Sequence, residues 1–169
     1  MSRQRQLSST VLGKVGLACP SAWLVLAALV LLAALPLNGA QAQGPASDSK
    51  PFAEHFLLLQ LSDADPEKQA MVLSAANNLL EHYGPDHIDI EVVTFGPGVR
   101  LLFADAPQQA QVNSLVAQGV RFVVCLNTID TIERSSGQRP ELSPHAIPVQ
   151  VGLAHVLERV EEGYVVIRP

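Results

Sequence analysis

Cys125 is the residue whose type and position most clearly suggest chemistry, and it follows a short run of branched and aromatic residues. The stretch Val120 to Val124 predicts a buried strand. Asn127 and Thr128 are good helix N-cap residues, and helical spacing follows them. The thiol is therefore expected between the carboxyl end of a strand and the amino end of a helix. Ligands collect there in open α/β sheets, and a helix amino end favours thiolate over thiol. We predict a partly exposed, nucleophilic thiol.

A second interpretation of Cys125 stays open. Free cysteines are commonly small apolar side chains packed under a loop, and the bulky neighbour Leu126 could shield the sulfur. His145 could approach the thiol and act as a base, but nothing in the sequence fixes that distance. The exposure of the Cys125 sulfur, together with what faces it across any subunit contact, is the most useful observation for separating a reactive from an inert thiol.

Other chemical groups in the chain predict less. The run Gly96-Pro97-Gly98 follows a predicted strand but matches no phosphate-binding glycine pattern, so we interpret it as a turn. That turn could line the same crevice as Cys125, and whether a small molecule binds there is open. None of the five histidines pairs with another at metal-ligand spacing, so we expect no metal, and no motif indicates a cofactor. Arg121 is interpreted as an ordinary edge or interface charge.

Residues 1–42 have the organisation of a cleavable signal peptide. Basic residues precede an apolar run, Ala22 to Leu35, and Ala40-Gln41-Ala42 supplies a signal peptidase site with the cut expected after Ala42. The alternative is an uncleaved membrane anchor, but the apolar run is shorter than the ~20 residues a spanning helix needs. We therefore predict a periplasmic or secreted protein without a stable membrane anchor after cleavage.

Removal of this segment changes both the charge and the cysteine count. Three of the 11 lysines and arginines lie before residue 43, whereas all 16 aspartates and glutamates follow it, so the remaining chain has a net charge of −8. Such an acidic domain repels phosphate backbones and offers no polybasic patch for anionic lipid, which argues against nucleic acid as a partner. Cys125 is then the single cysteine, so an internal disulfide is excluded.

The rest of the chain divides into a linker and one domain. Residues 43–53 are rich in Gly, Pro and Ser and predict a flexible linker, and residues 54–169 alternate strand and helix patterns. This alternation predicts a single α/β domain with a mainly parallel five-stranded sheet and helices on both faces. The expected strands are His55–Leu61, Ile88–Phe95, Val120–Val124, Ala146–Gln150 and Tyr164–Ile167.

The expected helices follow from caps and apolar spacing. One begins at Asp65-Pro66 and ends before Gly84, a second is opened by Asp105-Ala106-Pro107, and a third follows Cys125. Ser135 to Pro144 is interpreted as an exposed loop. The last helix, Val151–Glu162, has an expected buried stripe of Val151, Ala154, His155, Leu157 and Val160.

Several motifs resemble those of DsrE/DsrF-like proteins over residues 54–169. They are Asp65-Pro66-Glu67-Lys68-Gln69, Asn77-Asn78-Leu79-Leu80, Tyr83-Gly84-Pro85, Glu91-Val92-Val93, Phe95-Gly96-Pro97-Gly98, Gly119-Val120-Arg121-Phe122 with Cys125 and Asn127-Thr128, and Glu162-Gly163-Tyr164 with Pro169. The resemblance implies a three-layer α/β/α fold and homo-oligomers, often trimers or hexamers. It also implies a group whose members relay sulfur as a cysteine persulfide, with Cys125 at the matching position.

The resemblance thus implies an exported sulfur carrier or thiol-relay protein that uses Cys125 as persulfide acceptor. Its partners would be a sulfur donor protein and a sulfur acceptor protein, and it would act as a sulfurtransferase-like carrier if it is an enzyme at all. The alternative is a non-catalytic, oligomeric binding module in which Cys125 is structural.

Overall fold

The computed structural model describes residues 50–169. The predicted signal peptide 1–42 and most of the predicted linker lie outside the described residues. Within residues 50–169, none of the helices has the length and apolar character needed to cross a membrane.

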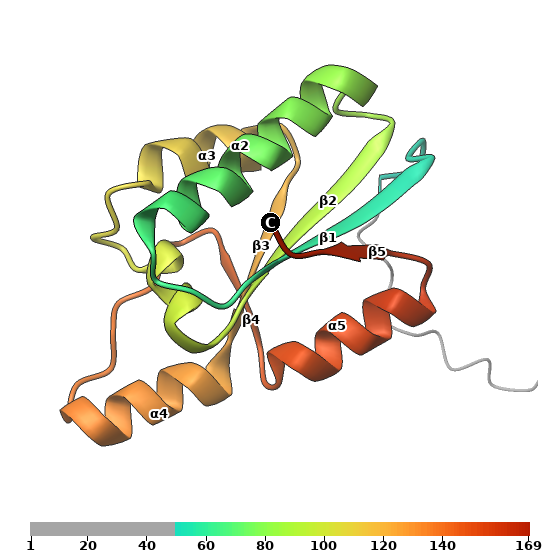
Figure 1. Cartoon of the computed structure of the whole chain (residues 1–169). Helices are drawn as coiled ribbons and strands as arrows, with labels where there is room; N and C mark the ends of the chain where they lie inside the picture. The colour runs from blue at the N-terminus through green and yellow to red at the C-terminus, as the bar shows by residue number, and fades with distance from the viewer. Residues whose placement is uncertain (1–49) are drawn as a thin grey trace, which may run out of the picture. The chain divides into compact units, whose positions relative to one another are not determined.

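Strands and helices alternate along the described chain, with one additional 3-10 helix (Figure 1). The strands are β1 (His55–Leu61), β2 (Ile88–Thr94), β3 (Arg121–Cys125), β4 (Ala146–Val149) and β5 (Val165–Ile167). The helices are α2 (Pro66–Tyr83), the 3-10 helix η1 (Gly96–Leu102), α3 (Gln109–Ala117), α4 (Leu126–Ser136) and α5 (Gly152–Glu161).

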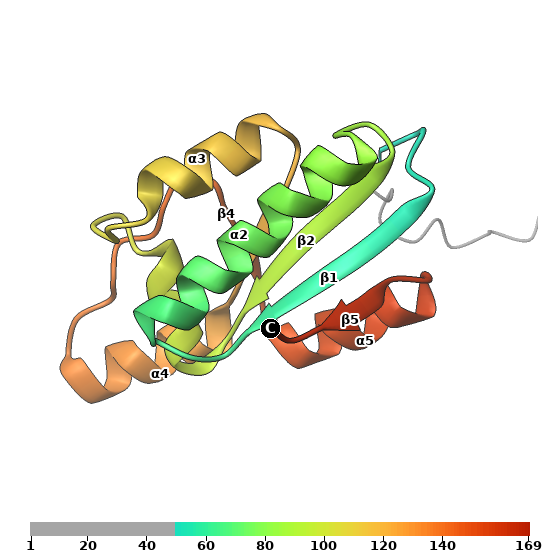
Figure 2. The same ribbon diagram turned by 45° about the horizontal axis from the view of Figure 1, so that its top comes forward.

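The strands form a single parallel sheet in the order β4-β3-β2-β1-β5. Helices α2 and α3 cover one face and α5 covers the other, as Figure 2 shows, so the expected α/β/α layering is confirmed. Pro148 lies in β4, at the edge of the sheet, where proline's missing N–H costs no ladder hydrogen bond to a further strand.

The two faces of the sheet differ in chemistry. The face under α2 and α3 carries the main apolar core, to which β1 contributes Leu57, Leu59 and Leu61 and α4 contributes Ile129. The face under α5 has a smaller apolar cluster around Leu58, Val93, Val123 and Tyr164. Since side chains alternate along a strand, the other residues that β2 and β3 present to α5 are charged or carry sulfur.

The ends of three helices differ from the sequence expectation. Gly96-Pro97-Gly98 begins the 3-10 helix η1 instead of forming a simple turn. Helix α3 begins at Gln109 instead of at Asp105, and the side-chain amide of Gln109 donates to the carbonyls of Leu101 and Phe103. The expected loop from Ser135 is shorter, since α4 continues to Ser136 and ends at Gly137 in the left-handed conformation.

The expected buried stripe of α5 is wrong. Leu157 and Val160 are 60% and 46% exposed, and Val151 and Ala154 are exposed as well. The side toward the sheet instead carries Gly152, His155, Val156 and Arg159, at spacings of three and four. The physical reason is that α5 packs over charged side chains of β2 and β3, which polar partners satisfy and apolar side chains would not.

Candidate thiol site

Cys125 ends β3 and is at the same time the N-cap residue of α4. Its sulfur lies on the α5 side of the sheet, where the backbone N–H of Gly152 donates to Sγ over 3.2 Å. Gly152 is the first residue of α5. The thiol is therefore placed at the amino ends of two helices, α4 and α5, both of which favour negative charge.

These donors determine the ionisation of the thiol. Burial by itself would raise the pKa of Cys125, but the N–H of Gly152, the N–H and hydroxyl of Thr128 and the N–H of Asn127 act in the opposite direction. Together they hold the pKa of the thiol below its ordinary value. The expected lowering of the thiol pKa therefore follows from the Gly152 hydrogen bond at the start of α5 together with the N–H groups and hydroxyl at the start of α4, where the sequence had indicated α4 alone.

The residues around the thiol are connected to one another. The Gly96 N–H donates to Thr128 Oγ1 over 3.1 Å, which leaves the hydroxyl proton of Thr128 available to the sulfur. Asn127 Oδ1 accepts a 2.7 Å bond from the side-chain amide of Gln150, and the Asn127 N–H donates to the Gln150 carbonyl. Gly96, at the start of η1, thus lies near the carboxyl end of β3 beside Cys125, as expected. Asn127 and Thr128 lie in the first turn of α4 and do not cap it.

The thiol is buried, so the expectation of partial exposure is wrong. Cys125 is 6% exposed. Gly152 packs closely against it: a Cβ added at Gly152 would lie 3.0 Å from Cys125 Cβ and 3.6 Å from Sγ. Glycine thus allows the first turn of α5 to approach the sulfur. His145 precedes β4, whereas Val149 at the other end of β4 pairs with Cys125, so His145 does not reach the thiol.

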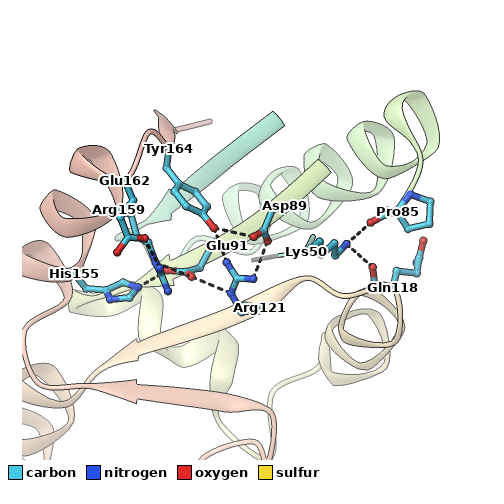
Figure 3. A network of polar contacts seen from close by, with 10 residues as sticks. All are labelled: Lys50, Pro85, Asp89, Glu91, Gln118, Arg121, His155, Arg159, Glu162 and Tyr164. Carbon is cyan, nitrogen blue, oxygen red and sulfur yellow. Dashed lines mark hydrogen bonds and ion pairs between the residues drawn. The ribbon is translucent and has the colours of Figure 1, made fainter. Parts of the chain in front are cut away.

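A cluster of ionised side chains lies on the same face of the sheet, toward the amino ends of β2 and β3 (Figure 3). Arg121 is its central cation. Its guanidinium lies 2.8 Å from Asp89 Oδ1 and 3.1 Å from Glu91 Oε2, and it donates a 2.9 Å bond to the Tyr164 hydroxyl. Arg121, whose side chain is 14% exposed, is thus a largely covered structural cation and not the edge or interface charge that we expected.

Helix α5 adds two residues to this cluster. His155 Nε2 contacts Glu91 Oε1, and Arg159 Nε lies 3.3 Å from Glu91 Oε2. Burial would raise the pKa of Glu91, but the bond with His155 and the charges of Arg159 and Arg121 outweigh it and hold this pKa below its usual value. The Tyr164 hydroxyl donates to Asp89 over 2.8 Å, and burial together with this bond raises the pKa of Tyr164 to about 12.

Lys50 contacts the described domain although we assigned it to the linker. Its ammonium donates to the carbonyls of Pro85 and Gln118, which lie beyond the ends of α2 and α3 (Figure 3). Lysine is favourable there because carbonyls at helix ends carry partial negative charge. Burial lowers the pKa of Lys50, while the carboxylates of Asp89 and Asp86 act in the opposite direction.

Sequence reasoning found the thiol but missed Gly152 and the ion-pair cluster. A glycine inside a predicted helix is unfavourable by about 1 kcal/mol relative to alanine, and this was the available signal for a close approach at Gly152. The signal for the cluster was the pair of acids, Asp89 and Glu91, in an otherwise apolar strand. Within residues 50–169, no group of His, Cys, Asp and Glu is arranged to hold a metal ion.

Comparisons with known proteins give similarity to solved structures. No family model matches the chain, and no curated protein matches it. Among solved structures, the chain is similar to a protein of unknown function, MTH1491, from Methanobacterium thermoautotrophicum, with 30% sequence identity and a TM-score of 0.61. The match covers 69% of this chain and 100% of that one. It carries no information on sulfur chemistry, so the resemblance to DsrE/DsrF-like proteins stays a prediction.

Proposed function

The chain belongs to the same family as the methanobacterial protein MTH1491. Since the function of that protein is unknown, the family suggests no activity, and we propose from the thiol site itself that Cys125 carries sulfur as a persulfide. The supporting observation is the 3.2 Å bond from the Gly152 N–H to Sγ, at the meeting point of two helix amino ends. A thiolate stabilised in this way is a competent nucleophile near neutral pH.

The transfer needs no cofactor and no net oxidation. The Cys125 thiolate attacks the outer sulfur of a donor persulfide, a new S–S bond forms on Cys125, and the donor S–S bond breaks. The donor leaves as a thiolate with the electron pair of the broken bond, and the outer sulfur keeps its proton. An acceptor thiolate then attacks the outer sulfur on Cys125 and regenerates the Cys125 thiolate, which the same N–H groups stabilise as the leaving group.

The burial of Cys125 determines how a donor must reach it. At 6% exposure, the sulfur is protected from solvent oxidants, which suits a carrier of a reactive persulfide. Access requires movement of the first turn of α5, which begins at Gly152 and follows the exposed residue Val151. We place this carrier outside the cytoplasm, in the periplasm or secreted, on the strength of the predicted signal peptide.

Replacement of Cys125 by serine is expected to abolish sulfur loading. After incubation with inorganic polysulfide as a sulfane sulfur donor, the intact mass of the wild-type protein should increase by one sulfur atom. The Cys125→Ser protein should show no increase, and reduction with dithiothreitol should reverse the increase in wild type. A folded wild-type protein that gains no sulfur from polysulfide or from a small-molecule persulfide would contradict the carrier proposal.

A second candidate function is a non-catalytic binding module with an inert cysteine. The observation that favours it is the burial of Cys125 beneath Gly152. Titration of the native thiol with an alkylating reagent separates the two. The carrier requires a pH profile shifted to lower pH than that of the unfolded chain, whereas an inert cysteine would react more slowly than in the unfolded chain at every pH.

We also propose that the protein acts as a homo-oligomer, as the resemblance implies. The supporting observation is the outer side of α5, where Leu153, Leu157 and Val160 are exposed at spacings of four and three.

Leu157→Glu is expected to shift the wild-type assembly, a trimer or hexamer, toward monomers in sedimentation velocity, because a buried contact would gain an unpaired charge. Met71→Glu, at a 52% exposed site on α2, is the matched control. A monomeric wild type would refute the proposal.

A further inference from the structure

Helix α5 is attached to the sheet mainly by polar contacts. Of the side chains that it turns toward the sheet, Val156 is the apolar member of the smaller core, whereas His155 and Arg159 enter the ion-pair cluster. Because apolar packing under α5 is sparse, the position of this helix depends on where its polar side chains find partners.

Glu91 is the partner that both of these α5 side chains share. Its side chain is 1% exposed. Glu91 Oε1 contacts His155 Nε2, and Glu91 Oε2 contacts both Arg159 Nε and Arg121 Nε. Glu91 lies on β2, a central strand of the sheet, where all seven residues are buried. It therefore provides a rigid anchor to which α5 is bound at two points one turn apart.

The groups around Glu91 restrict it in turn. Arg121 is held by Asp89 and by the Tyr164 hydroxyl, and the Arg159 guanidinium lies 5.5 Å above the Tyr164 ring. The remaining charged groups at this end of α5 and on the facing elements are Glu158 near His155 at 4.0 Å, Glu162 bound to Arg159 at 2.6 Å, and Lys50, which interacts with Asp89. Each acid of the cluster thus faces at least one base, and Glu91 faces three of them.

The same side of α5 carries both the anchor residues and the donor to the thiol. Gly152, His155 and Arg159 are three and four residues apart, so they lie on one face of the helix. With a rise of 1.5 Å per residue, the Gly152 end lies about 10 Å along the axis from the Arg159 end. A shift or tilt of α5 at the anchor is therefore transmitted to the N–H that faces Sγ.

We propose that Glu91 is a positioning residue for the thiol: by anchoring His155 and Arg159 it holds α5 so that the Gly152 N–H remains on Cys125 Sγ. This inference builds on the site of the proposed function, but it concerns thiolate stabilisation alone and does not require sulfur transfer. Loss of the anchor would leave the fold of the sheet in place and weaken the donor at the thiol.

The test is the pH dependence of Cys125 alkylation by iodoacetamide in Glu91→Gln. This variant keeps the shape of the side chain and removes its charge. We expect the profile to shift to higher pH and the acidic-side rate, taken relative to the alkaline plateau of the same variant, to fall about threefold, because less thiolate is present. Val92→Ala is the matched control: it removes a buried side chain from the next position of β2, on the other face, and should leave the alkylation profile unchanged.

A second variant protects the test against a failure to fold. Arg159→Gln changes the anchor from the α5 side, at a side chain that is 15% exposed, and should shift the profile in the same direction. Glu91→Asp, which keeps the charge, should recover part of the wild-type profile. Wild-type alkylation profiles in folded Glu91→Gln and Arg159→Gln would overturn the inference. A shifted profile in a protein that fails to load sulfur would support the positioning role and refute only the carrier.

Discussion

Replacing Arg121 with methionine is expected to lower the free energy of unfolding by about 3–5 kcal/mol, because it leaves buried acids short of a cation. Arg121 contacts Asp89 at 2.8 Å and Glu91 at 3.1 Å, and the side chains of both acids are almost fully buried. Methionine fills a similar volume, so the loss reports the missing charge and hydrogen bonds and not a cavity. Chemical denaturation at neutral pH measures it.

Arg139→Met is the matched control for this prediction. Arg139 also bridges two acids, Asp130 and Glu133, but its side chain is 45% exposed, so its removal should cost no more than about 1 kcal/mol. Similar losses in both variants would contradict the assigned role of the buried cluster.

The pH dependence of the Arg121→Met defect has a predictable sign. The pKa of Glu91 is lowered in the folded protein. Its ionised form therefore stabilises the fold at pH above the unfolded pKa, and this contribution is lost as the pH falls through the folded pKa. Arg121 supplies part of this effect, so the difference between variant and wild type should stay constant near neutral pH and shrink as the pH falls below the ordinary glutamate pKa of about 4.3 toward the lowered pKa of Glu91. A difference that grows at acidic pH would contradict this role for Glu91.

Replacing Gly152 with alanine is expected to shift the pH profile of Cys125 alkylation to higher pH, so that the acidic-side rate falls about tenfold relative to the alkaline plateau of the same variant, a ratio that is independent of how accessible the sulfur is. The added Cβ would lie 3.0 Å from Cys125 Cβ and 3.5 Å from Phe95 Cβ, so the first turn of α5 must move away from the sulfur. The N–H bond to Sγ then lengthens, and loss of a hydrogen bond to a charged group costs about 1.5–3 kcal/mol, enough for a tenfold smaller thiolate fraction. Overpacking should also lower the free energy of unfolding by about 1–3 kcal/mol.

Gly137→Ala separates the thiol effect of Gly152→Ala from general destabilisation. Gly137 has a φ of 76°, and a Cβ added there would meet no atom within 4 Å. Alanine at this position therefore introduces backbone strain of about 1–2 kcal/mol without changing any contact of the thiol. Its alkylation profile should match wild type. If Gly152→Ala also alkylates like wild type, the Gly152 N–H does not control the thiol.

Much of the fold could be predicted from the sequence because local chemistry marks the elements clearly. The strand His55–Leu61 is a nearly continuous apolar run, and its predicted bounds are the observed ones. Asp65 accepts a bond from the Glu67 N–H and Pro66 begins α2, as the acid and proline indicated. Proline within a strand favours an edge position or a strand start, and Pro148 lies in β4, the edge strand. In each case the determining interactions lie within a few residues of one another.

The candidate site could be predicted only in part, because its decisive contacts join residues that are distant in sequence. Cys125 was located at a strand–helix junction, but the helix that buries it starts at Gly152, 27 residues later. Glu91 and His155 are separated by 64 residues. The apolar spacing of α5 predicted that its apolar side faces the sheet. In the structure this side faces outward, because charged side chains of the sheet lie beneath the helix.

The sequence by itself determined the alternating strands and helices, the helix caps and the position of a single candidate nucleophile, because these follow from short-range backbone and side-chain preferences. Only the tertiary structure decided that a second helix amino end donates to the sulfur, that this sulfur is buried, and that charged residues hold the donating helix. These features depend on which side chains the parallel sheet brings opposite one another, and no local pattern encodes that pairing.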